Sequence, residues 1–290
     1  MPVPANPARV VLLIPAYNEE RRIEPVLRDY ARYFREHFPA GTFQIVVVLN
    51  GCRDNTFGVV GGVMRDFPEI RALNFAAPIG KGGALIEGLK LAKEADWIGY
   101  VDADGATPPA AFHDLLKRGE AVDCVIASRW VPGAVLHQSQ TGRRQFASRV
   151  FHLIVQGLFW MNIADTQCGA KVMRCDAVRK IHSALRIADM AFDINLLFAL
   201  KRAGYSILEV PTEWTDKIGS KVALGRTSLV MFLSVVRLRL VYSPFYYWLR
   251  VFRPLEAWVY RKLSAPPPLT SEQVRTESAR MVDGAAGSSG

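Results

Sequence analysis

Apolar runs separated by amphipathic segments make up most of the first part of the chain. Five runs show little polar alternation and end in breakers or polar residues: residues 9–14, 43–49, 70–75, 97–101 and 123–128. Short unbroken apolar runs are typical of strands that are buried on both faces. Residues 23–34 instead place apolar side chains at helical spacing. Strands that alternate with helices predict an α/β protein with a mostly parallel sheet and helices on both faces.

The pattern becomes less regular in the second part of the chain. A glycine-rich segment at Gly80 opens a predicted helix that runs to about residue 95. We expect a long apolar helix over 146–163 with its aromatic side chains, Trp160 included, in the core, and contact with lipid is the alternative. A helix over 194–203 and a strand over 206–210 are predicted to follow.

Basic residues are concentrated towards the end of the chain, which carries a net charge of +9 over 290 residues. Residues 217–262 contain one acidic residue, Glu256, and nine basic residues: Lys217, Lys221, Arg226, Arg237, Arg239, Arg250, Arg253, Arg261 and Lys262. They are mixed with aromatic residues in two apolar segments divided by Pro244, as in helices that lie in the headgroup plane of a membrane. A dimer interface or a cap on the core is the alternative. Nucleic-acid binding is disfavoured, because the sequence contains no recognition module.

These changes in composition divide the chain into four parts. Residues 1–8 are predicted to be a loose N-terminus, 9–225 the main α/β domain and 226–263 the basic aromatic helices. Residues 264–290 are rich in Pro, Ser and Gly and predict a disordered tail. The four cysteines form no Cys-x-x-Cys pair, so we do not expect a zinc site. With neither a secretory signal nor a run of about 18 apolar residues, the protein is expected to be cytoplasmic and peripheral on the inner face of the membrane.

Two aspartates one residue apart follow the fourth apolar run. Asp102 and Asp104 lie where that strand should end, and Gly105 comes next. Side chains two apart in a strand point to the same side, so we expect the two carboxylates to converge. Close carboxylates are stable with a cation between them, and hard oxygen ligands suit Mg²⁺ or Mn²⁺ that also binds substrate phosphates. A solvated Asp-rich turn without a metal is the plainer alternative.

Other polar strand ends are predicted to share the edge of the sheet that carries this pair. Ligands bind at the carboxyl ends of the strands in open parallel sheets. That edge would also carry residues 15–19, 50–54 and 80–83, and Arg129. Lys81 stands among three glycines at a predicted helix start, where free backbone N–H groups and a cation suit a phosphate. An ordinary glycine-rich loop with a solvated lysine is equally consistent with that segment.

Four motifs occur in an order that resembles one family of enzymes. They are Pro15-Ala16-Tyr17-Asn18-Glu19, Gly80-Lys81-Gly82, Asp102-Ala103-Asp104 and Asp165-Thr166-Gln167-Cys168-Gly169-Ala170-Lys171. Over residues 9–245 the chain is similar to the family 2 inverting glycosyltransferases of the GT-A fold, and among them to the polyprenyl-phosphate hexosyltransferases. The resemblance implies a metal-dependent transfer of a hexose, with glucose favoured over mannose, from a UDP- or GDP-sugar to a polyprenyl phosphate.

The resemblance also implies a role for each matching residue. Asp102 and Asp104 would bind the metal, with Asp104 a catalytic residue. The donor site would comprise Pro15, Ala16, Tyr17, Glu19, Asn50, Lys81, Gly82, Asp102, Ala103 and Asp104. The acceptor phosphate would be held by Arg129, Arg144, Ser148, Gln167, Lys217 and Lys221, and arginine can grip a phosphate with two parallel bonds. The basic aromatic segment would bind an anionic membrane surface.

The chain departs from the family pattern at two positions. The family usually has an acidic pair at the end of the second strand, where this chain has Asn50, so a carboxylate that reads the base is absent. We expect Asn50 to accept a hydrogen bond from the base through its amide oxygen. Ala106 stands where mannosyltransferase relatives often have Gln, which favours glucose.

Asp193 leaves the acceptor open. It matches the acid of an Ala-Phe-Asp motif, and in relatives with sugar acceptors an acid in this region is the catalytic base. A hydroxyl acceptor that Asp193 deprotonates is therefore a second hypothesis, whereas with a lipid phosphate Asp193 would only order the acceptor loop. A peripheral membrane protein that binds a nucleotide sugar without catalysis is a third hypothesis, and a homodimer is compatible with all three.

Overall fold

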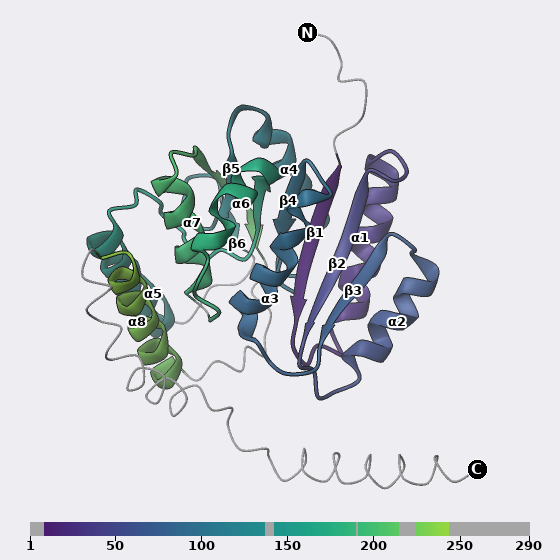
Figure 1. The fold of residues 1–290 in the computed structure, drawn as a ribbon, viewed down its shortest axis with the longest axis horizontal. Coiled ribbons are helices and arrows are strands. Elements are labelled where there is room, and N and C mark those ends of the chain that lie inside the picture. Colours follow the sequence, from purple (N-terminus) through teal and green to yellow (C-terminus); the bar gives the residue numbers. More distant parts are fainter. Residues whose placement is uncertain (1–8, 137–141, 190, 215–223, 244–290) are drawn as a thin grey trace, which may run out of the picture. The chain divides into compact units, whose positions relative to one another are not determined.

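A computed structural model describes residues 9–136, 142–189, 191–214 and 224–243 (Figure 1). Its centre is a seven-stranded sheet in the order β3-β2-β1-β4-β7-β5-β8, and β6 pairs separately with β9. The strands are β1 (Val10–Ala16), β2 (Phe43–Asn50), β3 (Ile70–Phe75), β4 (Trp97–Tyr100), β5 (Cys124–Ser128), β6 (Val135–Leu136), β7 (Lys171–Arg174), β8 (Ile207–Pro211) and β9 (Glu213–Trp214). The helices are α1 (Ile23–His37), α2 (Thr56–Asp66), α3 (Gly80–Gly88), α4 (Pro109–Arg118), α5 (Gly142–Phe159), α6 (Cys175–Ile181), α7 (Phe192–Arg202) and α8 (Leu224–Val241), and short 3₁₀ turns cover Leu89–Lys93, Gly119–Ala121 and His182–Ala184.

The central position of β1 explains its unbroken apolar run. Leu12 and Ile14 pack into a core that includes residues of α1, α2 and α4. Leu13, between them, packs into a second core that includes residues of α3, α6 and α7. Successive side chains of a strand point to opposite faces, so a strand covered on both faces needs apolar residues at every position. The expected α/β class is confirmed.

One of the seven strands runs against the others. β7 lies between β4 and β5 and is antiparallel to both, whereas β1, β2, β3 and β4 pair in parallel, as do β5 and β8. The sheet is therefore mixed and mostly parallel. The insertion of β7 brings Lys171 opposite Tyr100 of β4 and Ile126 of β5, which places a lysine in the middle of the sheet.

Helix α8 packs on the same compact unit as the sheet. Val235 and Leu238 are fully buried, and α8 contacts α5 (Figure 1). The sequence predicts basic aromatic helices at a membrane surface from residue 226, with a cap on the core as the alternative. Within the described residues, Val235 and Leu238 of α8 contribute to the core. None of the described helices is long and apolar enough to cross a membrane. The predicted loose N-terminus (1–8), the helix after Pro244 and the tail (264–290) lie outside the described residues.

Two predicted helices differ in extent from the observed ones. The helix expected over 80–95 is α3, which ends at Gly88, followed by a 3₁₀ turn. The helix expected over 146–163 is α5, which ends at Phe159. Trp160 takes a left-handed conformation with φ of 50°, a common way to end a helix. Its side chain is 83% exposed, so its expected place in the core was wrong, whereas Phe159 is buried.

Candidate active site

The end of β4 carries the two aspartates that the sequence singled out. The strand ends at Tyr100, and Asp102 and Asp104 lie beyond it in a turn where Gly105 has φ of 72°. The expected convergence therefore cannot come from strand alternation. Both aspartates lie instead in one turn, two residues apart. Burial raises the pKa of Asp104, and the charge of Asp102 raises it further. The backbone N–H of Ala106, 3.0 Å from Asp104 Oδ1, partly opposes both effects.

Lys81 supplies the positive charge at this site. Its Nζ lies 2.5 Å from Asp102 Oδ1, and the two side chains are 24% and 28% exposed. Burial disfavours the charged ammonium, but the carboxylates of Asp102, Asp193 and Asp104 raise the pKa of Lys81 above its ordinary value. Lys81 is therefore a permanent cation near neutral pH, at the start of α3, where the first N–H groups of the helix have no partner within it.

Close packing explains the glycines on either side of Lys81. Gly80 has φ of 79°, and a Cβ there would lie 2.3 Å from the carbonyl oxygen of Ala188. A Cβ on Gly82 would lie 2.6 Å from Cβ of Phe192. The N–H of Gly83 donates to the same Ala188 oxygen at 3.0 Å. The start of α3 thus rests directly on the segment that leads into α7, and this contact fixes the position of Lys81.

Gly169 performs a similar role for Asp102. A Cβ on Gly169 would lie 2.1 Å from Asp102 Oδ2 and 2.6 Å from Asp102 Cγ. The Asp102 carboxylate therefore lies against the backbone of the loop 165–171. Any side chain at position 169 would have to displace it.

The donor atoms of this site fit a hard divalent cation. The Asp102 carboxylate pairs with the ammonium of Lys81, and Asp104 follows two residues later in the same turn. Within the described ranges, no cluster of three or more His, Cys, Asp or Glu could hold a metal. A metal at Asp102 and Asp104 would thus take its remaining ligands from substrate phosphates and water, as Mg²⁺ commonly does.

The loops after β1 and β2 are tied to each other. The backbone N–H of Glu19 donates to Thr56 Oγ1 at 2.8 Å, and the N–H of Arg53 donates to Asn18 Oδ1 at 2.8 Å. The Glu19 carboxylate accepts two bonds from Arg22, at 2.7 and 2.8 Å. The first two contacts hold the two loops, which are predicted to bind the nucleoside, next to each other. The last two direct the Glu19 carboxylate towards Arg22.

The remaining donor-site residues differ in exposure. Tyr17 is exposed, Pro15 is half-buried, and Ala16 and Ala103 are buried. Gly82, which is buried, contributes close packing. Asn50, at the end of β2, directs its Oδ1 at the N–H of Ile79, 2.6 Å away.

Asp193 is buried in an ionic network. Its Oδ1 accepts a hydrogen bond from Lys171 Nζ at 2.6 Å and a short one from the Tyr100 hydroxyl. Burial alone would raise the pKa of Asp193, but the ammonium groups of Lys171 and Lys81 lower it below the usual range. Lys171 also donates to the carbonyl oxygen of Cys168 at 2.7 Å. A lowered pKa makes Asp193 a weak base, and these contacts link α7 to the loop 165–171.

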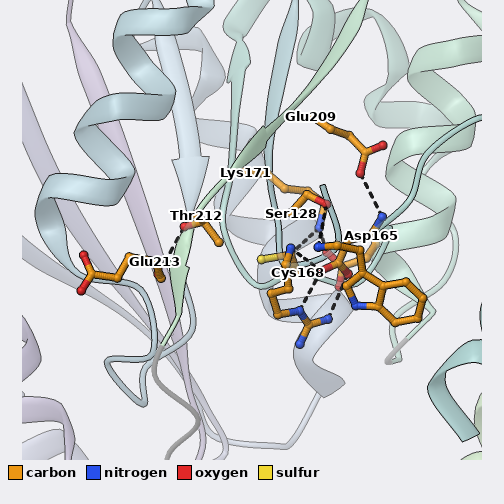
Figure 2. Close-up of polar contacts among 10 residues, drawn as sticks. Ser128, Asp165, Cys168, Lys171, Glu209, Thr212 and Glu213 are labelled. Carbon is orange, nitrogen blue, oxygen red and sulfur yellow. Dashed lines mark hydrogen bonds and ion pairs between the residues drawn. The ribbon is translucent and has the colours of Figure 1, made fainter. Parts of the chain in front are cut away.

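Arg129 lies at the end of β5 in a second buried ion pair (Figure 2). Its Nε and Nη2 donate to the Asp165 carboxylate at 2.7 and 2.9 Å. Burial opposes the ionised form of Asp165, but Arg129 holds the pKa of that carboxyl below its usual range. Glu209 accepts bonds from the N–H groups of Ala164 and Asp165 at 2.6 and 2.9 Å. Nε and Nη2 of Arg129 are therefore engaged by the loop 165–171.

The structure brings together only part of the predicted acceptor site. Arg129 and the half-buried Gln167 belong to described segments that meet at Asp165. Arg144 and Ser148 lie on α5, with side chains outside the described residues, as are Lys217 and Lys221 altogether. The acceptor role of these residues stays a prediction.

The family assignment follows from a comparison with known proteins. Residues 11–182, more than half of the chain, match the model of the glycosyl transferase family 2. The chain belongs to that family. It is a family 2 glycosyltransferase, as the order of its motifs predicted.

Curated relatives of this family 2 glycosyltransferase include several with one name. A dolichyl-phosphate β-glucosyltransferase of Trichomonas vaginalis is 31% identical over 235 residues, which cover 77% of this chain and 69% of that protein. Dolichyl-phosphate β-glucosyltransferases of Dictyostelium discoideum and Homo sapiens are 31% and 29% identical, covering 80% of this chain and 74% and 75% of theirs. These relatives carry the name of a polyprenyl-phosphate hexosyltransferase, the group of enzymes that the motifs of this chain resemble.

Solved structures establish the GT-A fold of the glycosyltransferase. Glucosyl-3-phosphoglycerate synthase from Mycobacterium tuberculosis in complex with UDP matches with a TM-score of 0.58 at 17% identity, over 80% of each chain. Its complex with Mn²⁺, UDP-glucose and phosphoglyceric acid matches with a TM-score of 0.59 at 18% identity, over 80% of each chain. At this level of identity the similarity concerns the fold alone.

Sequence analysis missed the residues that support the site. Lys171 neutralises the Asp193 carboxylate, the Tyr100 hydroxyl donates a hydrogen bond to it, and Arg22 binds the Glu19 carboxylate. One signal was present: Lys171 is a charged residue at the head of an apolar strand, and a buried lysine requires a partner. Its partner Asp193 is 22 residues away, so spacing alone could not identify the pair.

Proposed function

We propose that this family 2 glycosyltransferase moves a hexose, glucose in the first place, from a UDP-sugar to a polyprenyl phosphate with inversion at the anomeric carbon. One observation carries the proposal: at the end of β4, Asp102 and Asp104 lie with Lys81, whose Nζ is 2.5 Å from Asp102. Opposite charges at the carboxyl end of a strand suit a diphosphate together with a divalent cation. The names of the curated relatives support glucose and a dolichyl phosphate acceptor.

The donor would bind along the ends of β1, β2 and β4. Asp102 and Asp104 would hold Mg²⁺ or Mn²⁺, and such a cation neutralises the charge that develops on a departing diphosphate. Lys81 donates N–H groups to the same diphosphate from the start of α3. A neighbour of the same fold was solved with Mn²⁺ and UDP-glucose, which supports these choices.

The acceptor chemistry needs no protein base. A phosphate monoester is already anionic near neutral pH, so one of its oxygens can attack the anomeric carbon directly. The new bond joins that oxygen to the anomeric carbon, and the bond from the anomeric carbon to the diphosphate breaks, leaving UDP. The lowered pKa of Asp193 agrees with this scheme and disfavours a hydroxyl acceptor, because a general base works best with a pKa near the working pH.

The acceptor would approach from the side of β5 and α5. Arg129, Arg144, Ser148, Gln167, Lys217 and Lys221 are the residues that we propose to hold its phosphate. The basic aromatic segment over 226–263 would keep the enzyme peripheral on an anionic membrane surface, at the cytoplasmic face. Cations next to a lipid phosphate favour its binding through charge-assisted hydrogen bonds.

A donor screen tests the proposal directly. The purified protein is incubated with Mn²⁺, vesicles that contain a polyprenyl phosphate, and radiolabelled UDP-glucose, GDP-mannose or UDP-galactose, and label in the organic phase is counted. We expect transfer from UDP-glucose that depends on both the lipid phosphate and the metal. A preference for GDP-mannose would contradict the choice of sugar, and transfer only to soluble hydroxyl compounds would contradict the choice of acceptor.

A further inference from the structure

The side chain of Asn50 is held in one orientation. Its Oδ1 accepts a hydrogen bond from the backbone N–H of Ile79 at 2.6 Å. Only the oxygen of a side-chain amide can accept from an N–H, so this contact determines which end of the group faces Ile79. The oxygen that the sequence analysis expected to face the base is therefore directed at the protein.

The other end of the amide, the NH₂ group, has no protein acceptor among the described residues. Asn50 is only 6% exposed. Its Nδ2 is nevertheless absent from the fully enclosed unpaired polar atoms of the described part, which are Thr107 Oγ1 and Trp214 Nε1. Nδ2 therefore reaches the surface of an otherwise buried residue. Buried donors are nearly always paired, so this NH₂ group is suited to an acceptor on a ligand.

The position of Asn50 connects it to the proposed diphosphate site. Ile79, which binds its amide, is followed by Gly80 and Lys81 at the start of α3. Two residues of backbone span at most about 7 Å, so the amide lies within the length of a nucleoside from Lys81. Lys81 in turn contacts Asp102 at 2.5 Å. A nucleotide with its phosphates at Lys81 and Asp102 can place its base at Asn50.

We infer that Asn50 Nδ2 donates a hydrogen bond to a ring carbonyl oxygen of the donor's base, and so selects bases that carry a carbonyl, such as uracil. The inference rests on the proposed function only in taking a nucleoside diphosphate sugar as the donor. An aspartate at this position would present an acceptor and would need an N–H of the base instead. The hydrogen bond to the base thus has the opposite polarity from the one that a carboxylate would make.

Asn50→Asp tests this polarity with little change in shape. One carboxylate oxygen can still accept from the Ile79 N–H, and the other replaces the NH₂ group. Kd values for UDP, ADP and pyrophosphate are measured by calorimetry with Mn²⁺ on the full-length wild type and the variant. We expect UDP binding to weaken about tenfold or more, because an acceptor then faces a carbonyl oxygen. Pyrophosphate, which has no base, should bind both proteins equally.

A matched control separates the contact from the added charge. Asn74→Asp adds the same charge on an exposed position of the neighbouring strand β3, and should leave the Kd for UDP unchanged. The wild type alone provides a second measurement: ADP, whose base has no carbonyl, should bind about tenfold more weakly than UDP. If Asn50→Asp fails to fold, which thermal melting would reveal, equal binding of ADP and UDP by the wild type would still overturn the inference.

Equal or tighter binding of UDP by Asn50→Asp would overturn the inference, as would equal binding of ADP and UDP by the wild type. A contact to a ribose hydroxyl would give the first of these results, because a hydroxyl can donate to a carboxylate. Failure of the proposed function looks different. In that case the wild type itself does not transfer glucose to lipid phosphate, whatever the Kd values of the variant.

Discussion

Asp193 Oδ1 lies 2.6 Å from Lys171 Nζ, and both side chains are shielded from solvent. The pair joins α7 to β7 in the middle of the sheet, and Lys171 continues to the carbonyl oxygen of Cys168. The next residue, Gly169, lies against Asp102. A buried ion pair thus supports the loop on which the Asp102 carboxylate rests.

Asp193→Asn should destabilise the protein by about 3–5 kcal/mol, because it leaves Lys171 buried without a counter-charge. The measurement is the free energy of unfolding in urea at pH 7. The double variant Asp193→Asn, Lys171→Met removes the orphaned charge and should recover part of the loss. Equal stability of wild type and Asp193→Asn would contradict the contribution of the pair.

The same pair predicts a pH dependence with a definite sign. The pKa of Asp193 is lower in the folded protein than its ordinary value of 3.8. Its contribution to stability is therefore fully present above about pH 4 and is lost as the pH falls through the folded-state pKa. Unfolding curves measured between pH 2 and 5 should show a steeper loss for the wild type than for Asp193→Asn. Parallel curves would show that Asp193 has the same pKa in both states.

Gly169→Ala should reduce glucose transfer strongly, since a Cβ would lie 2.1 Å from Asp102 Oδ2 and would displace that carboxylate. We expect kcat/KM for UDP-glucose to fall about a hundredfold, as for other misplaced catalytic groups. Gly157→Ala is the control, because a Cβ at this exposed position of α5 would meet nothing within 4 Å. Activity of Gly169→Ala equal to that of the control would mean that Asp102 need not occupy its observed position.

Lys81→Met should lower kcat/KM for UDP-glucose about a hundredfold or more, through loss of a preorganised cation at the diphosphate. The comparison is Lys90→Met, which removes an exposed lysine paired with Glu87 at 2.6 Å and should leave kcat/KM unchanged. Because its pKa is raised, Lys81 keeps its charge at alkaline pH, so wild-type activity should not fall between pH 8 and 9.5 through this group. Similar kinetics for the two variants would argue against a role for Lys81 at the donor.

The sequence predicted the charged residues that line this site better than the buried residues that hold them in place. Asp102, Asp104 and Lys81 were identified because strand ends and glycine-rich helix starts leave a local pattern. The order of the strands in the sheet leaves no local pattern in the sequence. Residues Lys171–Arg174 are predicted as a short strand, but nothing near them shows that this strand runs antiparallel between β4 and β5. The burial of Asp193 depends on that insertion, so the sequence alone leaves its role open between a catalytic base and a residue that orders the acceptor loop.

Asn50 illustrates the same limit at the scale of one hydrogen bond. The residue was correctly placed at the end of β2. Which end of its amide faces a ligand depends on Ile79, 29 positions away. Trp160 is a related case, because the left-handed backbone that turns it outward is a property of the helix end and not of the apolar pattern. Local residue patterns predict helices, strands and clusters of charged residues. The role of each side chain depends on its contacts with residues far away in the sequence, which these patterns do not reveal.

The central claim is that Asp102 and Asp104 hold a cation that transfer requires. The most direct measurement is the transfer of labelled glucose from UDP-glucose to polyprenyl phosphate by Asp104→Asn over a titration of Mn²⁺. The matched control is Asp114→Asn on α4, where the side chain is 46% exposed. We predict a rate about a thousandfold lower for Asp104→Asn at every Mn²⁺ concentration, an unchanged rate for Asp114→Asn, and no wild-type transfer in EDTA. Transfer by Asp104→Asn at the wild-type rate, or by the wild type in EDTA, would contradict the claim.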